Sequence, residues 1–175
     1  SARYEGCKDR LLFVTYSTVF EYLGYLEAIC RALDPLGARA ALFLAAAVSD
    51  YFQPWAEMAE HKISIPGPLE LRLARTPKML GALRERWCPR ALVVSFKLET
   101  DQDVLFHKAT DALETYRMDA VVANELHSRA QRVHVFWRGQ PKQTIERQGD
   151  ERVERPLVAA IVRAHARLLG GEGRG

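Results

Sequence analysis

Three side chains, those of Asp50, Phe96 and Asn124, stand at or just after the end of an apolar run of the sequence. A carboxylate and an amide can bind polar atoms of a ligand, and a phenyl ring can stack on a flat base. Lys62 and Lys108 are further candidates, because lysine binds phosphate as a point charge. Together these residue types predict a site for an anionic ligand that carries a ring.

Arg75 and Lys78 add positive charge beside a predicted helix N-terminus, where free N–H groups favour phosphate. Each candidate also has a purely structural explanation. Asp or Asn after a strand often belongs to a turn, a strand-end phenylalanine often belongs to the core, and single lysines usually lie at the surface. Residue types alone therefore predict a phosphate- or nucleotide-binding domain, and for each residue both explanations stay open.

The apolar run 40–48 is the centre of the predicted fold. Pro35 and Gly37 precede it and Pro54 follows it, which leaves room for a strand but not for a long helix. A strand without polar alternation is typical of a parallel sheet that helices cover on both faces. The small side chains at 45–47 leave the backbone open to a ligand, and such sheets bind ligands at the carboxyl ends of their strands.

The rest of the chain alternates in the same way. Strands are expected at 11–16, 69–74, 91–96 and 118–124, with a hairpin at 133–137 and 143–146. Helices are expected after Ser17 or Thr18, from Thr76 and Pro77, from Asp101, and over 153–169. This order predicts an α/β fold of three layers: a mainly parallel sheet, helices on both faces, and an antiparallel hairpin near the C-terminus.

The length of 175 residues suits one domain with a hydrophobic core, and 48% hydrophobic with 27% charged residues is ordinary for a globular protein. We expect a frayed segment at 1–10, a single domain over 11–169 and a flexible glycine-rich tail at 170–175. No apolar run reaches the roughly 18 residues of a membrane helix, and no signal-peptide pattern opens the sequence.

Several classes of function are disfavoured. The basic residues are spread despite a net charge of +3, and no helix-turn-helix or RNP-like pattern occurs, so no nucleic-acid partner is expected. The three cysteines and five histidines form no CxxC, HxxxH or HExxH spacing, which argues against zinc and for a reducing, cytoplasmic setting. No GxGxxG follows a strand, so an ordinary dehydrogenase ranks low.

Six segments, taken in order, resemble the eukaryotic form of the phosphopantothenate–cysteine ligase family. They are 45–51 (AAAVSDY), 60–63 (EHKI), 68–69 (PL), 77–80 (PKML), 95–101 (SFKLETD) and 121–124 (VVAN). The resemblance implies a Rossmann-like, homodimeric enzyme of coenzyme A biosynthesis. Such an enzyme joins 4′-phosphopantothenate to cysteine through an acyl-nucleotidate and releases pyrophosphate and a nucleoside monophosphate. It implies ATP as co-substrate, with CTP as the bacterial alternative, and Mg²⁺.

The resemblance also implies roles for particular residues. Ala46, Ala47 and Asp50 match the motif that holds phosphopantothenate or the acyl intermediate. Lys62 matches a catalytic loop lysine that neutralises charge developing at the α-phosphate, a role that is physically sensible.

Phe96 and Asn124 match nucleotide-binding positions, and Lys108 lies near a phosphate-binding basic residue of the family. The family's Gly-Gly-Thr turn and Asn-Phe-Ser-Ser-Gly stretch do not occur in these residues, which therefore resemble the C-terminal portion of the enzyme. We expect this chain alone to be inactive. The competing hypothesis is a non-catalytic fragment or degenerate homologue that binds nucleotide or serves as a dimerisation module.

Overall fold

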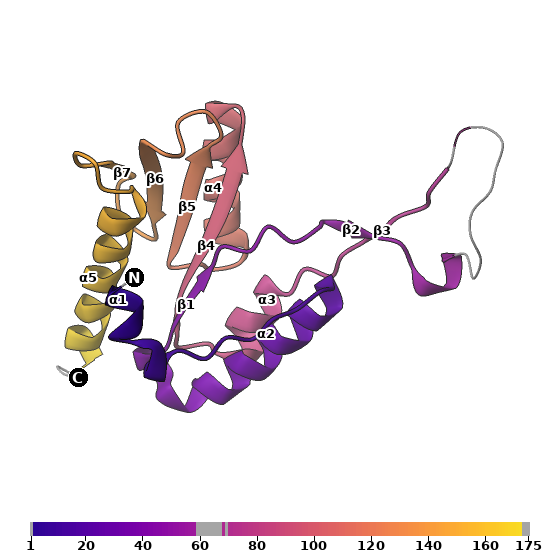
Figure 1. The fold of residues 1–175 in the computed structure, drawn as a ribbon, viewed down its shortest axis with the longest axis horizontal. Coiled ribbons are helices and arrows are strands. Elements are labelled where there is room, and N and C mark those ends of the chain that lie inside the picture. Colours follow the sequence, from indigo (N-terminus) through magenta and orange to yellow (C-terminus); the bar gives the residue numbers. More distant parts are fainter. Residues whose placement is uncertain (1, 59–67, 69, 173–175) are drawn as a thin grey trace.

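A five-stranded sheet in the order β1-β4-β5-β6-β7 forms the centre of the computed structural model, which describes residues 2–58, 68 and 70–172 (Figure 1). Its strands are β1 Ala41–Leu44, β4 Leu92–Glu99, β5 Ala120–Glu125, β6 Arg132–Trp137 and β7 Gln143–Glu146. β1, β4 and β5 pair in parallel, while β6 and β7 form an antiparallel hairpin at one edge. The predicted mainly parallel sheet and its hairpin are therefore confirmed.

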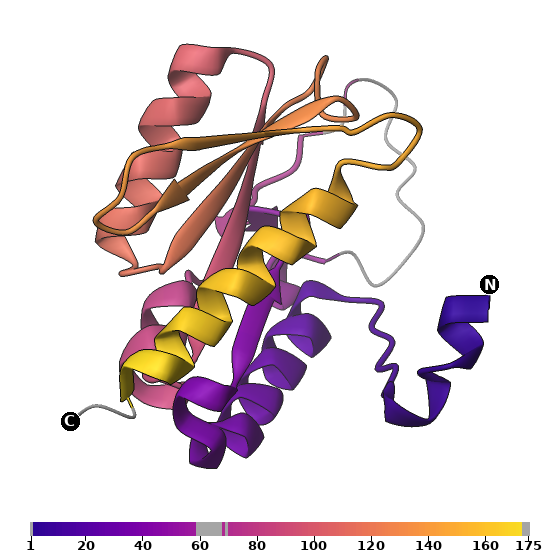
Figure 2. The same ribbon diagram turned by 90° about the vertical axis from the view of Figure 1, so that its left-hand side faces the viewer.

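Helices lie on both faces of this sheet, as predicted. One face carries α2 Val19–Leu33, the short α3 Leu80–Ala82 with the π-helical turn η4 Leu83–Trp87, and α4 Gln102–Thr115. The other face carries α5 Glu154–Glu172, which crosses the sheet diagonally in Figure 2. The shorter helices are α1 Ala2–Glu5, η1 Lys8–Arg10, η2 Asp34–Arg39 and η3 Trp55–Glu57. No helix in the described ranges is long and apolar enough to cross a bilayer.

A two-stranded ribbon, β2 Tyr51–Phe52 with β3 Ala74–Arg75, projects away from the sheet (Figure 1). Thr76 ties the base of this ribbon, because its hydroxyl donates to the carbonyl of Ser49 at 2.8 Å and its N–H donates to the carbonyl of Asp50 at 2.9 Å.

The two central strands are buried on both faces, which explains their continuous apolar sequence. Val93 and Val121 face the core under α2 and α4, while Val94 and Val122 face the core under α5, and each is at most 1% exposed. Cys30 lies in the first of these cores as a free thiol, and burial raises its pKa to about 11. Both strands confirm the prediction of a parallel, helix-covered sheet.

Three sequence-based expectations are wrong. The central strand is shorter than 40–48 and is not buried on both faces, because β1 is the edge strand of the sheet and leaves Phe43 43% exposed. The segment 11–16 forms no strand, and Leu12 is 87% exposed. The strand expected at 69–74 is reduced, within the described residues, to the ribbon pair Ala74–Arg75.

The helix expected from Thr76 and Pro77 begins instead at Leu80. The reason is that the Thr76 hydroxyl, which we expected to cap the helix, donates a hydrogen bond to the carbonyl of Ser49 at the base of the two-stranded ribbon. The other caps are confirmed: Thr18 and Glu21 form a capping box, and Asp101 accepts from the N–H of Val104 at 2.9 Å. The final helix α5 continues past the predicted end to Glu172.

His134 on β6 is a buried titratable group in the core under α4. It is 5% exposed, its Nδ1 lies 3.0 Å from Thr144 Oγ1, and its ring contacts that of Phe106 at 4.9 Å. Its Nε2 has no hydrogen-bond partner among the described residues. Burial, aided by Lys142 and Arg132 and opposed by Glu125, lowers the pKa of His134.

This lowered pKa predicts a pH-dependent stability. The folded protein disfavours the imidazolium form of His134. The stability that the neutral side chain contributes is therefore complete at pH values above the unfolded pKa of about 6.5. It is lost as the pH falls through the lower pKa of the folded state. We expect the melting temperature to fall between pH 7 and pH 5, and to fall less steeply in His134→Gln. Thermal melts at matched ionic strength check this, and parallel curves for both proteins would contradict it.

Candidate nucleotide and acyl-substrate site

Phe96 and Asn124 lie on neighbouring strands and on the same face of the sheet. In the parallel register of β4 and β5, Phe96 stands opposite Val122 and Leu98 stands opposite Asn124. Because side chains two residues apart share a face, all four point to the face that carries α5, where Phe96 packs against the core. The structure therefore brings the two predicted nucleotide-binding residues together at the carboxyl edge.

This part of the sheet leaves apolar side chains accessible to solvent. Phe96 is partly buried and Leu98 is 48% exposed, so apolar area remains accessible beside Asn124. The Asn124 Oδ1 atom is buried yet has no hydrogen-bond partner within the described ranges. A buried acceptor without a donor is costly, and a ligand N–H would relieve that cost. An amide beside an apolar surface is what a flat, polar-edged base requires.

Phe43 extends the aromatic surface from the neighbouring strand β1. Its ring lies 5.1 Å from that of Phe96, and the two planes meet at 83°, an edge-to-face arrangement. The sequence did not single out Phe43, because it lies inside a run read as buried on both faces. The missing information is that β1 is an edge strand, which the local sequence does not encode.

Ala45 and Ala46 line a mostly apolar cavity of 260 Å³ between the end of β1 and helix α2. Phe43 lines the same cavity. Its remaining walls come from α2, the preceding segment and β1: Val14, Tyr16, Tyr22, Tyr25, Leu26, Ile29 and Leu44. Burial raises the pKa of Tyr22, so this hydroxyl stays a neutral donor. Ala47, the other predicted substrate residue, is exposed just beyond the cavity's two alanines.

Asp50 lies at the base of the projecting ribbon rather than at the end of the strand. Its main-chain carbonyl accepts from the N–H of Thr76, and its side chain is exposed, with no hydrogen bond to other described residues. The carboxylate is therefore available to a ligand, at the base of the ribbon that projects away from the sheet (Figure 1).

Of the two predicted lysines, Lys108 is described by the structure, and it does not lie beside the aromatic surface. Lys62 lies outside the described residues. Lys108 lies on α4, and its Nζ is 2.6 Å from a carboxylate oxygen of Glu99. Since α4 covers the face opposite α5, Lys108 is separated by the sheet from Phe96 and Asn124.

The helix N-terminus expected beside Arg75 and Lys78 begins at Leu80, later than predicted, and belongs to a very short helix. Arg75 pairs with Tyr51 in the ribbon, and Lys78 precedes a helix that begins at Leu80 and is only three residues long before its π-helical turn. These two cations are solvated charges near the ribbon.

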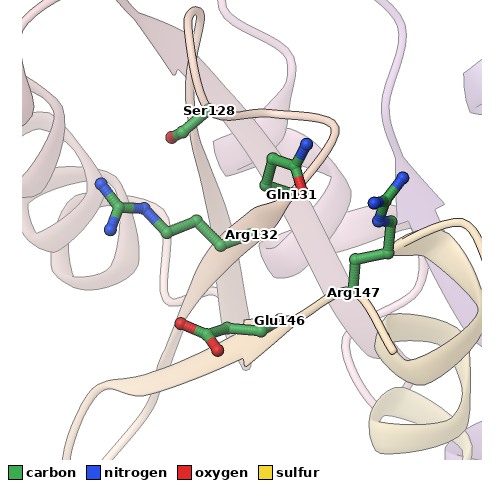
Figure 3. Close-up of a pocket in the computed structure, with 5 residues that line it drawn as sticks. All are labelled: Ser128, Gln131, Arg132, Glu146 and Arg147. Carbon is green, nitrogen blue, oxygen red and sulfur yellow. The ribbon is translucent and has the colours of Figure 1, made fainter. Parts of the chain in front are cut away.

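A second, polar cavity of 320 Å³ lies where β5 leads into β6 and β7 ends (Figure 3). Its walls are Ser128, Gln131, Arg132, Glu146 and Arg147. The side chains of Arg132 and Arg147 extend in different directions, so their guanidinium groups do not converge on one anion (Figure 3).

Arg132 is also paired with Glu125 at 3.4 Å. The hydroxyl of Ser128, followed by Arg132, lowers the pKa of Glu125. The charges of this cavity are therefore largely compensated. No group of three or more His, Cys, Asp or Glu side chains that could hold a metal ion occurs among the described residues.

Known proteins are similar to this chain in sequence and in fold. The family model for the DNA/pantothenate metabolism flavoprotein C-terminal domain matches residues 27–164. Phosphopantothenate–cysteine ligase 1 of Arabidopsis thaliana is 52% identical over 123 residues, which cover 70% of this chain and 39% of the relative. The phosphopantothenate–cysteine ligase of Homo sapiens is 39% identical over 164 residues, covering 91% and 53%.

A solved structure of a Cab2 mutant in complex with phosphopantothenate-cysteine superposes with a TM-score of 0.88 at 30% identity. The match covers 98% of this chain and 58% of that one. The chain thus spans about half the length of the curated relatives it matches. Because the family model covers most of the sequence, the chain belongs to the family of the DNA/pantothenate metabolism flavoprotein C-terminal domain.

Proposed function

We propose that this chain provides the nucleotide-binding and acyl-substrate surfaces of a phosphopantothenate–cysteine ligase in coenzyme A biosynthesis. The observation that carries the proposal is the junction at Phe43, where the Phe96–Asn124 surface adjoins the cavity of Ala45 and Ala46. A reaction between a nucleotide and a carboxylic acid needs two such sites in contact. The names of the relatives, and the product-like ligand of the Cab2 complex, support the same reaction.

In the proposed first step, a carboxylate oxygen of 4′-phosphopantothenate attacks the α-phosphorus of ATP. The bond from that phosphorus to the bridging oxygen breaks, and pyrophosphate leaves with the electron pair. In the second step, the cysteine amine attacks the acyl carbon of the acyl-nucleotidate. The nucleoside monophosphate leaves, the amine loses a proton and the amide is formed.

The residues of this chain bind and orient the reactants in these steps. Phe96 and Asn124 hold the base, Ala46 and Ala47 allow the acyl group to approach the backbone, and Asp50 receives a polar group of the substrate. Lys62 neutralises the charge that develops at the α-phosphate.

Because the described residues offer no carboxylate cluster, Mg²⁺ is proposed to be held mainly by the nucleotide phosphates. CTP is the alternative co-substrate. We place the enzyme in the cytoplasm as a homodimer.

Cysteine-dependent release of pyrophosphate from ATP and phosphopantothenate tests the proposal. The assay compares this chain with the same residues joined to the upstream half of the rice relative, which is 40% identical over 167 residues. We expect turnover in the extended protein, abolished when phosphopantothenate is omitted. A folded extended protein that releases no pyrophosphate with either ATP or CTP would remove the ligase proposal.

The second candidate is a nucleotide-binding or dimerisation module without turnover. It is favoured by the observation that Phe96 and Asn124, for which we propose nucleotide binding, both lie within a chain that spans about half the length of its relatives. Titration calorimetry and light scattering separate the candidates. A module binds ATP or dimerises, but the extended protein shows no turnover. A ligase binds ATP, forms a dimer and shows turnover in the extended protein.

A further inference from the structure

Phe43 has an unusual position for a large apolar residue in a sheet. Its neighbours Leu42 and Leu44 face the core under α2, so Phe43 points to the opposite face. Its partner in the β1–β4 register, Val94, is 1% exposed, whereas Phe43 is 43% exposed. A large part of the Phe43 side chain is therefore not packed in the core.

The Phe43 ring contacts that of Phe96, edge to face, with ring centres 5.1 Å apart and planes at 83°. This geometry places the positive edge of one ring against the negative face of the other and favours one orientation of the pair. A partly exposed phenylalanine without such a neighbour would be freer to change rotamer, and the entropy of fixing it would reduce ligand affinity.

Phe43 is also one of the residues that line the cavity of Ala45 and Ala46, so it lies where the proposed base site adjoins the acyl cavity. We propose that Phe43 is a positioning residue for the nucleobase: its ring holds Phe96 in the orientation that stacks on the base. This inference rests on the proposed function, because it needs a nucleotide at Phe96.

The test is calorimetry of this 175-residue chain with ATP and, separately, with inorganic tripolyphosphate, which carries the phosphates without a base. Phe43→Leu removes the aromatic edge and is expected to weaken ATP binding about three- to tenfold, with tripolyphosphate binding unchanged. Phe43→Tyr keeps the ring and is expected to bind ATP as the wild type does. Thermal melts confirm that each variant is folded.

A matched control is available at Phe20, which is 52% exposed and forms an edge-to-face pair with Phe52 at 4.9 Å and 88°. Phe20→Leu is expected to leave ATP affinity unchanged.

The proposal is overturned if Phe43→Leu binds ATP normally, if it loses ATP and tripolyphosphate equally, if Phe43→Tyr fails to retain ATP affinity, or if Phe20→Leu has the same effect. In each of those cases the proposed function survives, because the wild type still binds ATP. A wild-type chain that binds no ATP overturns the positioning role and the nucleotide-binding role together.

Discussion

Replacing Lys62 by glutamine is expected to slow pyrophosphate release about 100- to 1,000-fold while leaving the melting temperature unchanged. Glutamine keeps a polar, unbranched side chain, somewhat shorter than that of lysine, but removes its charge. Charge accumulates on the α-phosphate oxygens as the carboxylate attacks, and a lysine placed there stabilises the transition state more than the bound substrate. The Michaelis constant for ATP should therefore change much less than the turnover number.

The measurement uses the protein extended with the upstream half of a relative, and Lys8→Gln serves as the control. Lys8 is an exposed lysine in a surface pair with Glu5, far in sequence from the motif segments. An unchanged rate in Lys62→Gln would identify Lys62 as a surface lysine. An equal fall in the rate of Lys8→Gln would show that the overall positive charge of the protein, rather than the position of Lys62, sets the rate.

Replacing Asp119 by alanine is expected to lower the free energy of unfolding by about 3 kcal/mol. Asp119 precedes β5, and its two carboxylate oxygens accept from the guanidinium of Arg84 at 2.7 Å and the main-chain N–H of Val93 at 2.8 Å. The side chains of Arg84 and Asp119 are only 14% and 25% exposed, so water replaces the lost partner poorly. Arg84 also donates to the carbonyl of Ala91, which ties the turn after η4 to the sheet.

For a domain of this size the loss corresponds to a fall of about 6–12 °C in melting temperature. Asp111→Ala is the matched control, because the Asp111 side chain is 61% exposed and forms a surface pair with His107 on the same helix. We expect that variant to stay within about 0.5 kcal/mol of the wild type. If both variants melt alike, the Asp119 carboxylate does not hold η4 and β4 to the start of β5.

The sequence correctly predicts those elements whose local sequence preferences agree with their position in the tertiary structure. β4 and β5 are continuous apolar runs, and they occupy the centre of the sheet, where both faces are buried. Asp101 and the Thr18–Glu21 box cap helices whose apolar stripes also match the core. The failures occur where tertiary context overrides a local signal, as at Thr76, whose hydroxyl bonds Ser49 in place of a helix N-terminus.

The candidate site shows the same division. Phe96 and Asn124 could be expected together because the carboxyl ends of adjacent parallel strands meet at one edge. The sequence does not reveal which face of a strand a neighbouring helix covers, and so it placed Lys108 with them although α4 covers the opposite face. Phe43 was missed for a related reason, since only the strand order shows that β1 is an edge.

The central claim is that the carboxyl edge on the α5 side of the sheet receives the base of the nucleotide. A crystal structure with a non-hydrolysable ATP analogue tests it most directly. The account predicts that the base stacks on Phe96, with its polar edge paired to the amide of Asn124 and the α-phosphate directed toward Ala46. An analogue bound elsewhere, such as in the polar cavity of Arg132 and Arg147, with Phe96 and Asn124 untouched, would contradict it.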